Sequence, residues 1–121
     1  MTTASTLLQD NPNRVFNERD ANRRAQAIQE LYAADVTFYE HQATSSGTEA
    51  IARAVTHLLG ALPPTLTFSM AAPPMLNHAM GKLLWRGHLD GTTVVTGTDI
   101  AQIEKGRIRS LHVFVDAPKE S

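Results

Sequence analysis

In the first half of the chain, apolar residues recur every three or four positions, which is the spacing of amphipathic helices. The first such segment covers residues 5–17, and its apolar positions are Leu7, Leu8, Val15 and Phe16. Pro12 lies in its middle. Either Asn11 caps a helix that starts at this proline, or the proline disturbs one longer helix. We favour one helix over residues 5–17 with a disturbance at Pro12.

The same spacing predicts two more helices. Asp20 is a typical N-cap for a second helix, which should end near Ala34. Thr48 can cap a third helix, which Pro63 and Pro64 terminate. The apolar stripe of the second helix comprises Ala25, Ile28, Leu31 and Tyr32, and that of the third comprises Ile51, Val55, Leu58, Leu59 and Leu62.

The remaining segments are rich in β-branched and aromatic residues, which predicts strands. They cover residues 36–40, 65–71, 76–89, 92–103 and 107–115. Asp90–Gly91 and residues 104–106 are the turn signals between the last three strands, and residues 116–121 should fray. Helices grouped early and strands grouped late indicate an α+β fold with a curved antiparallel sheet, not alternating βαβ units.

The 121 residues predict a single domain, 1–121, in which 42% of residues are hydrophobic and 19% are charged. This balance excludes an intrinsically disordered chain. The net charge of −1 leaves no basic excess for phosphates, so no nucleic-acid partner is expected. No apolar run approaches the ~20 residues of a membrane span, and the N-terminus lacks a signal-peptide pattern. We therefore expect a cytoplasmic protein that does not bind membranes.

Two acidic residues fall on the apolar faces of predicted strands. In the first strand Val36, Phe38 and Glu40 point one way, and in the strand over 92–103 the more apolar face carries Val95, Gly97, Asp99, Ala101 and Ile103. A carboxyl group that faces an apolar interior is costly when charged, and an enzyme can use such a group as a general acid or base. The alternative is that Glu40 lies in water at a strand end and that Asp99 bonds a turn or an arginine.

Metal and thiol chemistry find no support in the sequence. Cysteine is absent, which excludes disulfides, thiol nucleophiles and cysteine–zinc sites. The five histidines show neither an i,i+4 helical pair nor a zincin pattern; they are His41, His57, His78, His88 and His112. We therefore expect no metal and no cofactor.

Five segments together resemble a known family, the SnoaL-like domains of the nuclear transport factor 2 superfamily. They are residues 16–20, 31–40, 47–51, 97–108 and 113–116. The resemblance implies a cystatin-like, cone-shaped α+β barrel in which three N-terminal helices cover a bent, mostly antiparallel sheet and enclose a pocket. Members of the family include ketosteroid isomerases, polyketide cyclases and proteins without known activity, and many are homodimers.

On the ketosteroid isomerase pattern, Glu40 falls at the position of the catalytic base and Asp99 at that of the neutral, hydrogen-bond-donating acid. The tyrosine that completes the oxyanion hole of those enzymes falls at Phe16, and a supporting tyrosine falls at Val55. The resemblance therefore implies the two acids of the site but not steroid isomerisation. Tyr32 is retained on the second helix.

The sequence thus predicts a mostly apolar pocket for a small, apolar carbonyl compound. Its expected lining is Phe16, Tyr32, Phe38, Leu83, Trp85, Leu111 and Val113. In an enzyme, Glu40 would take a proton from the carbon next to the carbonyl and Asp99 would donate to the enolate, without a cofactor, as in an isomerase, a cyclase or a dehydratase-like lyase. The alternative is a non-catalytic ligand-binding or dimerisation domain.

Apolar residues also occur on the strand faces opposite the pocket. They are Leu84, Val94, Ile100 and Phe114. Three helices cannot cover both faces of the sheet, and a large exposed apolar patch is unusual in a monomer. We therefore expect a homodimer that forms through the sheet. In a purely structural dimer, Glu40 and Asp99 would both be paired with arginine or solvent.

Overall fold

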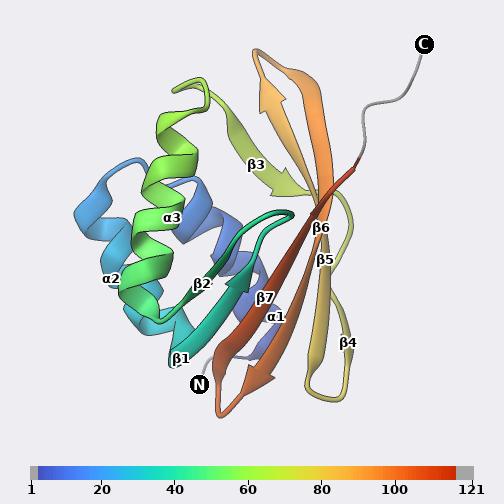
Figure 1. Cartoon of the computed structure of the whole chain (residues 1–121). Coiled ribbons are helices and arrows are strands. Elements are labelled where there is room, and N and C mark those ends of the chain that lie inside the picture. Colours follow the sequence, from blue (N-terminus) through green and yellow to red (C-terminus); the bar gives the residue numbers. More distant parts are fainter. Residues whose placement is uncertain (1–2, 117–121) are drawn as a thin grey trace.

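Four helical segments pack on one face of a single curved sheet (Figure 1) in a computed structural model that describes residues 3–116. The helical segments are α1 (Ala4–Asp10), the π-helical η1 (Asn11–Phe16), α2 (Ala21–Leu31) and α3 (Thr48–Gly60). The strands are β1 (Tyr32–Tyr39), β2 (Thr44–Ser46), β3 (Thr67–Met70), β4 (Met75–Asn77), β5 (Met80–Leu89), β6 (Thr92–Glu104) and β7 (Arg107–Val115).

The strand order is β2-β1-β7-β6-β5-β3, and β4 pairs with β5. All pairs are antiparallel except β1 with β7, which is parallel. The α+β fold is confirmed. The sheet is curved but does not close into the expected barrel, because β2 and β3 remain at its two edges. The tail that should fray lies, apart from Asp116, outside the described residues.

Pro12 changes the register of the first helix, as the sequence predicts. Proline has no backbone N–H, so it cannot donate the next bond of an α-helix. The chain widens into a π-helix instead, and the N–H of Asn17 donates to the carbonyl of Pro12 at 2.8 Å. This widened turn buries Asn11, Pro12 and Val15 against the sheet.

The second helix begins as predicted and ends early. The Asp20 carboxylate accepts the backbone N–H groups of Asn22 and Arg23 at 2.9 and 3.0 Å, which confirms the N-cap. The helix ends at Leu31 and not near Ala34, because Tyr32 already has extended backbone angles and opens the strand that pairs with β7.

Two other expectations about element boundaries are wrong. The N-cap of α3 is Gly47, with φ 87°, and Thr48 is the first helical residue. The expected single strand over 76–89 is two strands, because the chain turns at His78, with φ 54°, and folds β4 back onto β5. That turn contains no glycine, so it gave no turn signal in the sequence.

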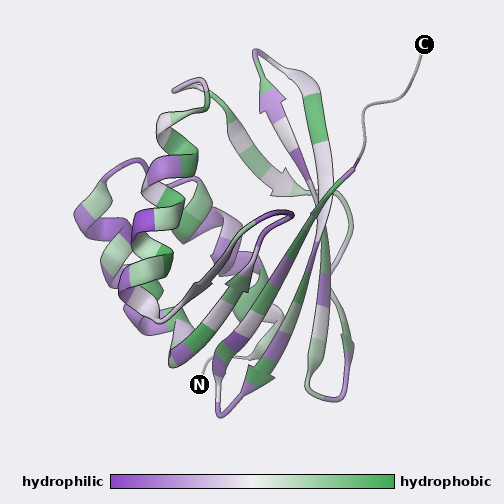
Figure 2. Cartoon of the chain, in the orientation of Figure 1, coloured by the Kyte–Doolittle hydropathy of each residue, from purple (hydrophilic) through white to green (hydrophobic). Residues whose placement is uncertain are grey.

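The hydrophobic core lies between the helices and the inner face of the sheet. Hydrophobic and hydrophilic residues alternate along the elements (Figure 2), so that one side of each faces this core. Its largest fully buried side chains are Tyr32, Phe38, Leu7, Leu8, Ile28, Ile51, Leu83, Ile108 and Leu111.

Within residues 3–116, no helix covers the outer face of the sheet (Figure 1), and three of the four apolar side chains assigned to this face are exposed, whereas Ile100 is partly buried. Leu84, Val94 and Phe114 are 36%, 55% and 55% exposed. This agrees with the strand faces assigned from the sequence. The homodimer across this face stays a prediction. Among the described residues, no helix is long and apolar enough to cross a membrane.

Gly97 lets the indole of Trp85 lie flat against β6. The two residues are paired across β5 and β6, and a Cβ at position 97 would lie 2.2 Å from Cζ2 of Trp85 and 2.4 Å from the carbonyl oxygen of Phe114. Such distances require the indole or the backbone of β7 to move. Any side chain at this position would therefore disturb the packing of Trp85.

We expect Gly97→Ala to lower the free energy of unfolding by roughly 2 kcal/mol or more, as overpacking of a core does. Gly60→Ala is the matched control, because a Cβ at the last residue of α3 meets nothing within 4 Å. The control should be neutral or stabilise by up to about 1 kcal/mol. Urea denaturation measures the unfolding free energy of both variants. Equal stability of the two variants would contradict this account of Trp85 packing.

Candidate functional site

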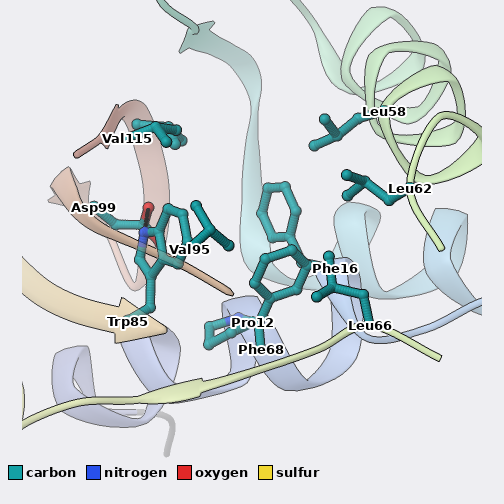
Figure 3. A pocket seen from close by; sticks show the side chains of 11 residues that line it. Pro12, Phe16, Leu58, Leu62, Leu66, Phe68, Trp85, Val95, Asp99 and Val115 are labelled. Carbon is teal, nitrogen blue, oxygen red and sulfur yellow. Dashed lines mark hydrogen bonds between the residues drawn. The ribbon is translucent and has the colours of Figure 1, made fainter. Parts of the chain in front are cut away.

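A cavity of about 210 Å³ lies between the inner face of the sheet, η1 and the end of α3, and it is partly open to solvent. Its lining residues are Pro12, Phe16, Leu58, Leu62, Leu66, Phe68, Trp85, Val95, Asp99, Val113 and Val115. Figure 3 shows Asp99 beside Trp85, with the rings of Phe16 and Phe68 nearby. Asp99 is the one titratable residue of this lining, so the cavity is an apolar chamber with a single carboxyl group.

The structure brings four of the predicted site residues to this cavity. They are Phe16, Trp85, Asp99 and Val113. Tyr32, Phe38, Leu83 and Leu111 do not line it, and each is at most 2% exposed within the core. Strand alternation assigned these four side chains correctly to the inner face. The first two helical segments fill that part of the face with their own apolar side chains, and the cavity remains only toward the end of α3.

The other lining residues were not predicted as pocket residues. Leu58 and Leu62 belong to the stripe of the third helix, and Phe68 and Val95 lie in predicted strands, so each carried a signal for burial. Nothing in the sequence distinguished a side chain that closes the core from one that borders a cavity.

Glu40 lies one residue beyond β1 and is half-buried. Its backbone N–H donates to the carbonyl of Ala43 at 2.8 Å, in the turn that leads to β2. The strand ends at Tyr39, so the alternation that pointed Glu40 inward does not extend to it. Glu40 is not among the residues that line the cavity, and its role as a base stays a prediction.

Asp99 is 5% exposed and its carboxylate is held by two neutral donors. Nε1 of Trp85 donates to Oδ1 at 2.9 Å, and Nδ2 of Asn11 lies 3.5 Å from Oδ2. The Tyr32 hydroxyl donates in turn to Oδ1 of Asn11. The chain of bonds therefore runs from β1 through η1 to β6 and β5. None of the ion pairs in residues 3–116 involves Asp99, so it bonds neither the turn nor the arginine of the alternative reading.

Burial raises the pKa of Asp99 to about 7, although the hydrogen bonds from Trp85 and Asn11 act in the opposite direction. Both protonation states of this carboxyl are consequently accessible near neutral pH, which is the property required of a general acid or base. Burial, and next the nearby Asp99, also raise the pKa of Tyr32, so that its hydroxyl stays protonated and acts as a donor.

Three aromatic rings form a wall of the cavity. Phe68 packs edge-to-face on Phe16, with 6.4 Å between ring centroids, and on Trp85, with 5.6 Å. Edge-to-face pairs of this kind add to the stability that burial alone supplies. The wall next to Asp99 is therefore closely packed and apolar, which is what keeps this carboxyl away from water.

The part of the chain that the structure describes holds no group of three or more histidine, aspartate or glutamate side chains arranged to bind a metal ion. The titratable group in the lining of the cavity is the Asp99 carboxyl, which accepts from Trp85 and Asn11.

The raised pKa of Asp99 sets a sign for the pH dependence of stability. Between about pH 4 and 7 the unfolded chain has released this proton while the folded protein retains it, so stability falls as the pH rises. Asp99→Asn removes this decline. Relative to the wild type, its unfolding free energy should rise by about 1.4 kcal/mol per pH unit over that range and level off above it.

Urea unfolding at a series of pH values measures the difference. The control is Asp90→Asn, an exposed carboxyl in the turn between β5 and β6. The unfolding free energy of this control, plotted against pH, should run parallel to that of the wild type. A parallel curve for Asp99→Asn would show that Asp99 is not neutral in the folded protein.

No family model and no curated protein matches the chain, whereas many solved structures share its fold. A candidate isomerase of the SnoaL-like family from Agrobacterium tumefaciens strain C58 is 24% identical, with a TM-score of 0.85 over 93% of this chain and 96% of that one. A candidate SnoaL-like polyketide cyclase from Jannaschia sp. CCS1 is 14% identical, with a TM-score of 0.73 over 96% and 90%.

A protein of ketosteroid isomerase-like fold from Catenulispora acidiphila, solved in complex with trimethylamine, is 16% identical, with a TM-score of 0.71 over 94% and 86% of the two chains. At these identities the likeness extends to the fold. The arrangement of helices on one face of a curved sheet is that of the SnoaL-like, nuclear transport factor 2-like fold.

Proposed function

We propose that the cavity binds a small, mainly apolar carbonyl compound and that neutral Asp99 donates a hydrogen bond to the carbonyl oxygen. The observation that carries this proposal is the position of Asp99, a buried carboxyl in the wall of an otherwise apolar cavity. The general kind of function agrees with the candidate isomerases and polyketide cyclases that share the fold.

The volume of the cavity limits the ligand. An apolar cavity of about 150 Å³ holds one benzene molecule. The 210 Å³ here enclose one ring with a short substituent, and a four-ring steroid would extend from the open side into solvent. A cyclic enone of six carbons has the size, the apolar surface and the single acceptor that this chamber matches.

In the proposed reaction a base takes a proton from the carbon next to the carbonyl, and the negative charge moves to the carbonyl oxygen. Asp99 stabilises this enolate by its hydrogen bond, which strengthens as charge develops. The base then returns the proton to another carbon of the conjugated system, so no net proton is consumed. We assign the base to Glu40 because of its position in the family pattern, and its test is separate from that of Asp99.

Conversion of 3-cyclohexenone to its conjugated isomer, followed by ultraviolet absorbance, tests both assignments. Asp99→Leu removes the hydroxyl donor and should lower the rate by roughly 10²–10³-fold. Glu40→Gln keeps the shape but cannot accept the proton, and should lower the rate by roughly 10²–10⁴-fold. Asp90→Asn is the control and should keep the wild-type rate. Wild-type activity in Asp99→Leu contradicts the proposal, and wild-type activity in Glu40→Gln removes Glu40 as the base.

A second candidate function is the non-catalytic binding of a small alkylammonium ion. Three aromatic rings and one carboxyl border the cavity, and a cation is attracted to both. A structure of the same fold was solved with trimethylamine. In this case the ionised form of Asp99 would be the one that binds.

The two candidates differ in the sign of their pH dependence. A ketone requires neutral Asp99, so its affinity should fall as the pH rises through about 7, by up to tenfold per pH unit above that value. The affinity for trimethylammonium should rise over the same range. Trp85 is the only tryptophan and lines the cavity, so its fluorescence reports both titrations. A ketone affinity that rises with pH would exclude the carbonyl proposal.

A further inference from the structure

Tyr32 and Asn11 form a buried pair behind the acid of the cavity. Both side chains are 2% exposed, and neither lines the cavity. The Tyr32 hydroxyl donates to Oδ1 of Asn11, and Nδ2 of the same amide faces Oδ2 of Asp99. We propose that Tyr32 and Asn11 are positioning residues, which orient the amide so that the Asp99 hydroxyl has no protein acceptor and points to the ligand. This inference rests on the proposed function for its ligand.

The direction of the Asp99 hydroxyl follows from the donors around it. Oδ1 accepts the indole N–H of Trp85 at 2.9 Å, so the proton of the neutral carboxyl resides on Oδ2. The hydrogen-bond partner of Oδ2 in the described part of the chain is the Asn11 nitrogen, which donates and cannot accept. The hydroxyl therefore finds its acceptor in the cavity, where the side chain of Asp99 forms part of the wall.

Tyr32 decides which atom of the Asn11 amide faces Asp99. An amide presents a donor at one end and an acceptor at the other, and a rotation of half a turn exchanges them. Because a hydroxyl donor occupies Oδ1, the nitrogen faces the carboxyl. Without that hydroxyl the amide can rotate, and its oxygen can accept the proton of Asp99. The neutral form of Asp99 would then be stabilised. The amide oxygen would compete with the ligand for the hydrogen bond that the Asp99 hydroxyl donates.

The groups around Asp99 do not supply another explanation for its titration. From β5 the contact is Trp85, from η1 it is Asn11, and the remaining wall of the cavity from α3, β3 and β7 is apolar. Tyr32 is the titratable side chain that interacts with Asp99, and burial keeps it neutral. The Asn11 amide is thus the group of this network whose orientation can change the pKa of Asp99.

The first arm of the test needs no ligand. Carbon-13 NMR of the Asp99 carboxyl gives its titration midpoint in the wild type, Tyr32→Phe and Asn11→Leu. Asn11→Leu removes a donor to the ionised form, and Tyr32→Phe lets the amide turn its oxygen toward the neutral form, so each midpoint should rise by roughly half to one pH unit. The control is Tyr39→Phe, which alters the other tyrosine of the chain, on the outer face. An unchanged midpoint in Tyr32→Phe, or a lower one in Asn11→Leu, would overturn the proposal.

The second arm measures the affinity for cyclohexanone at pH 5, where Asp99 is neutral, by the fluorescence of Trp85. Tyr32→Phe should weaken binding roughly three- to tenfold, because the rotated amide competes for the hydroxyl. Asn11→Leu removes the competitor and should bind within twofold of the wild type. The double variant should match Asn11→Leu. A loss in Asn11→Leu equal to that in Tyr32→Phe would indicate a merely structural role and overturn the assignment.

The two arms separate this inference from the proposed function. If the wild type does not bind cyclohexanone, the carbonyl ligand is wrong and the titration of Asp99 alone decides whether Tyr32 and Asn11 orient its proton. If cyclohexanone binds and Tyr32→Phe changes neither measurement, the proposed function stands and the positioning role is rejected.

Discussion

The hydrogen bond from the Trp85 indole to Asp99 connects the packing of the sheet to the chemistry of the cavity. The indole reaches the carboxyl only because Gly97, directly opposite on β6, has no side chain. The same ring packs against Phe68 and keeps water from the acid. Two effects then act on one carboxyl: burial favours its neutral form, and the N–H donors favour its charge. Their balance leaves an acid that can exist in both forms near neutral pH.

Much of the fold and part of the site followed from local pattern. Alternation along the late strands placed Asp99 and Trp85 on the inner face, and the exposed apolar residues of the outer face were assigned by the same argument. Turns with glycine were found, and the turn at His78 was not, because it contains no glycine to mark it between two segments of strand-forming residues. A pattern of period two specifies a face and says nothing about which part of that face remains unfilled.

The hydrogen-bond network of Asp99, Asn11 and Tyr32 could not be predicted from strand alternation. Asn11 and Tyr32 meet through a widened helical turn at Pro12 and a second helix that ends at Leu31. Both depend on how the helices pack on the sheet. Glu40 shows the converse. Its position suits the family pattern, but the strand ends one residue before it, so alternation could not place it at the cavity. Strand alternation can place two acids on the same face of a sheet only where both residues lie within their strands.

The π-helical turn at Pro12 has a consequence for how this chain tolerates insertions and deletions. A π-helix holds one more residue in its hydrogen-bonded ring than an α-helix does. Loss of one residue from η1 would restore an α-helical turn, which completes the same rotation with about one residue fewer. α1 would then keep its apolar side on the sheet, and the change would be confined to the turn itself, which carries Asn11, Pro12 and Val15. A homologue one residue shorter in this segment would therefore keep the fold but differ in the side chains that the turn presents to the buried acid, and the length of this turn is a marker by which relatives with the same network can be recognised.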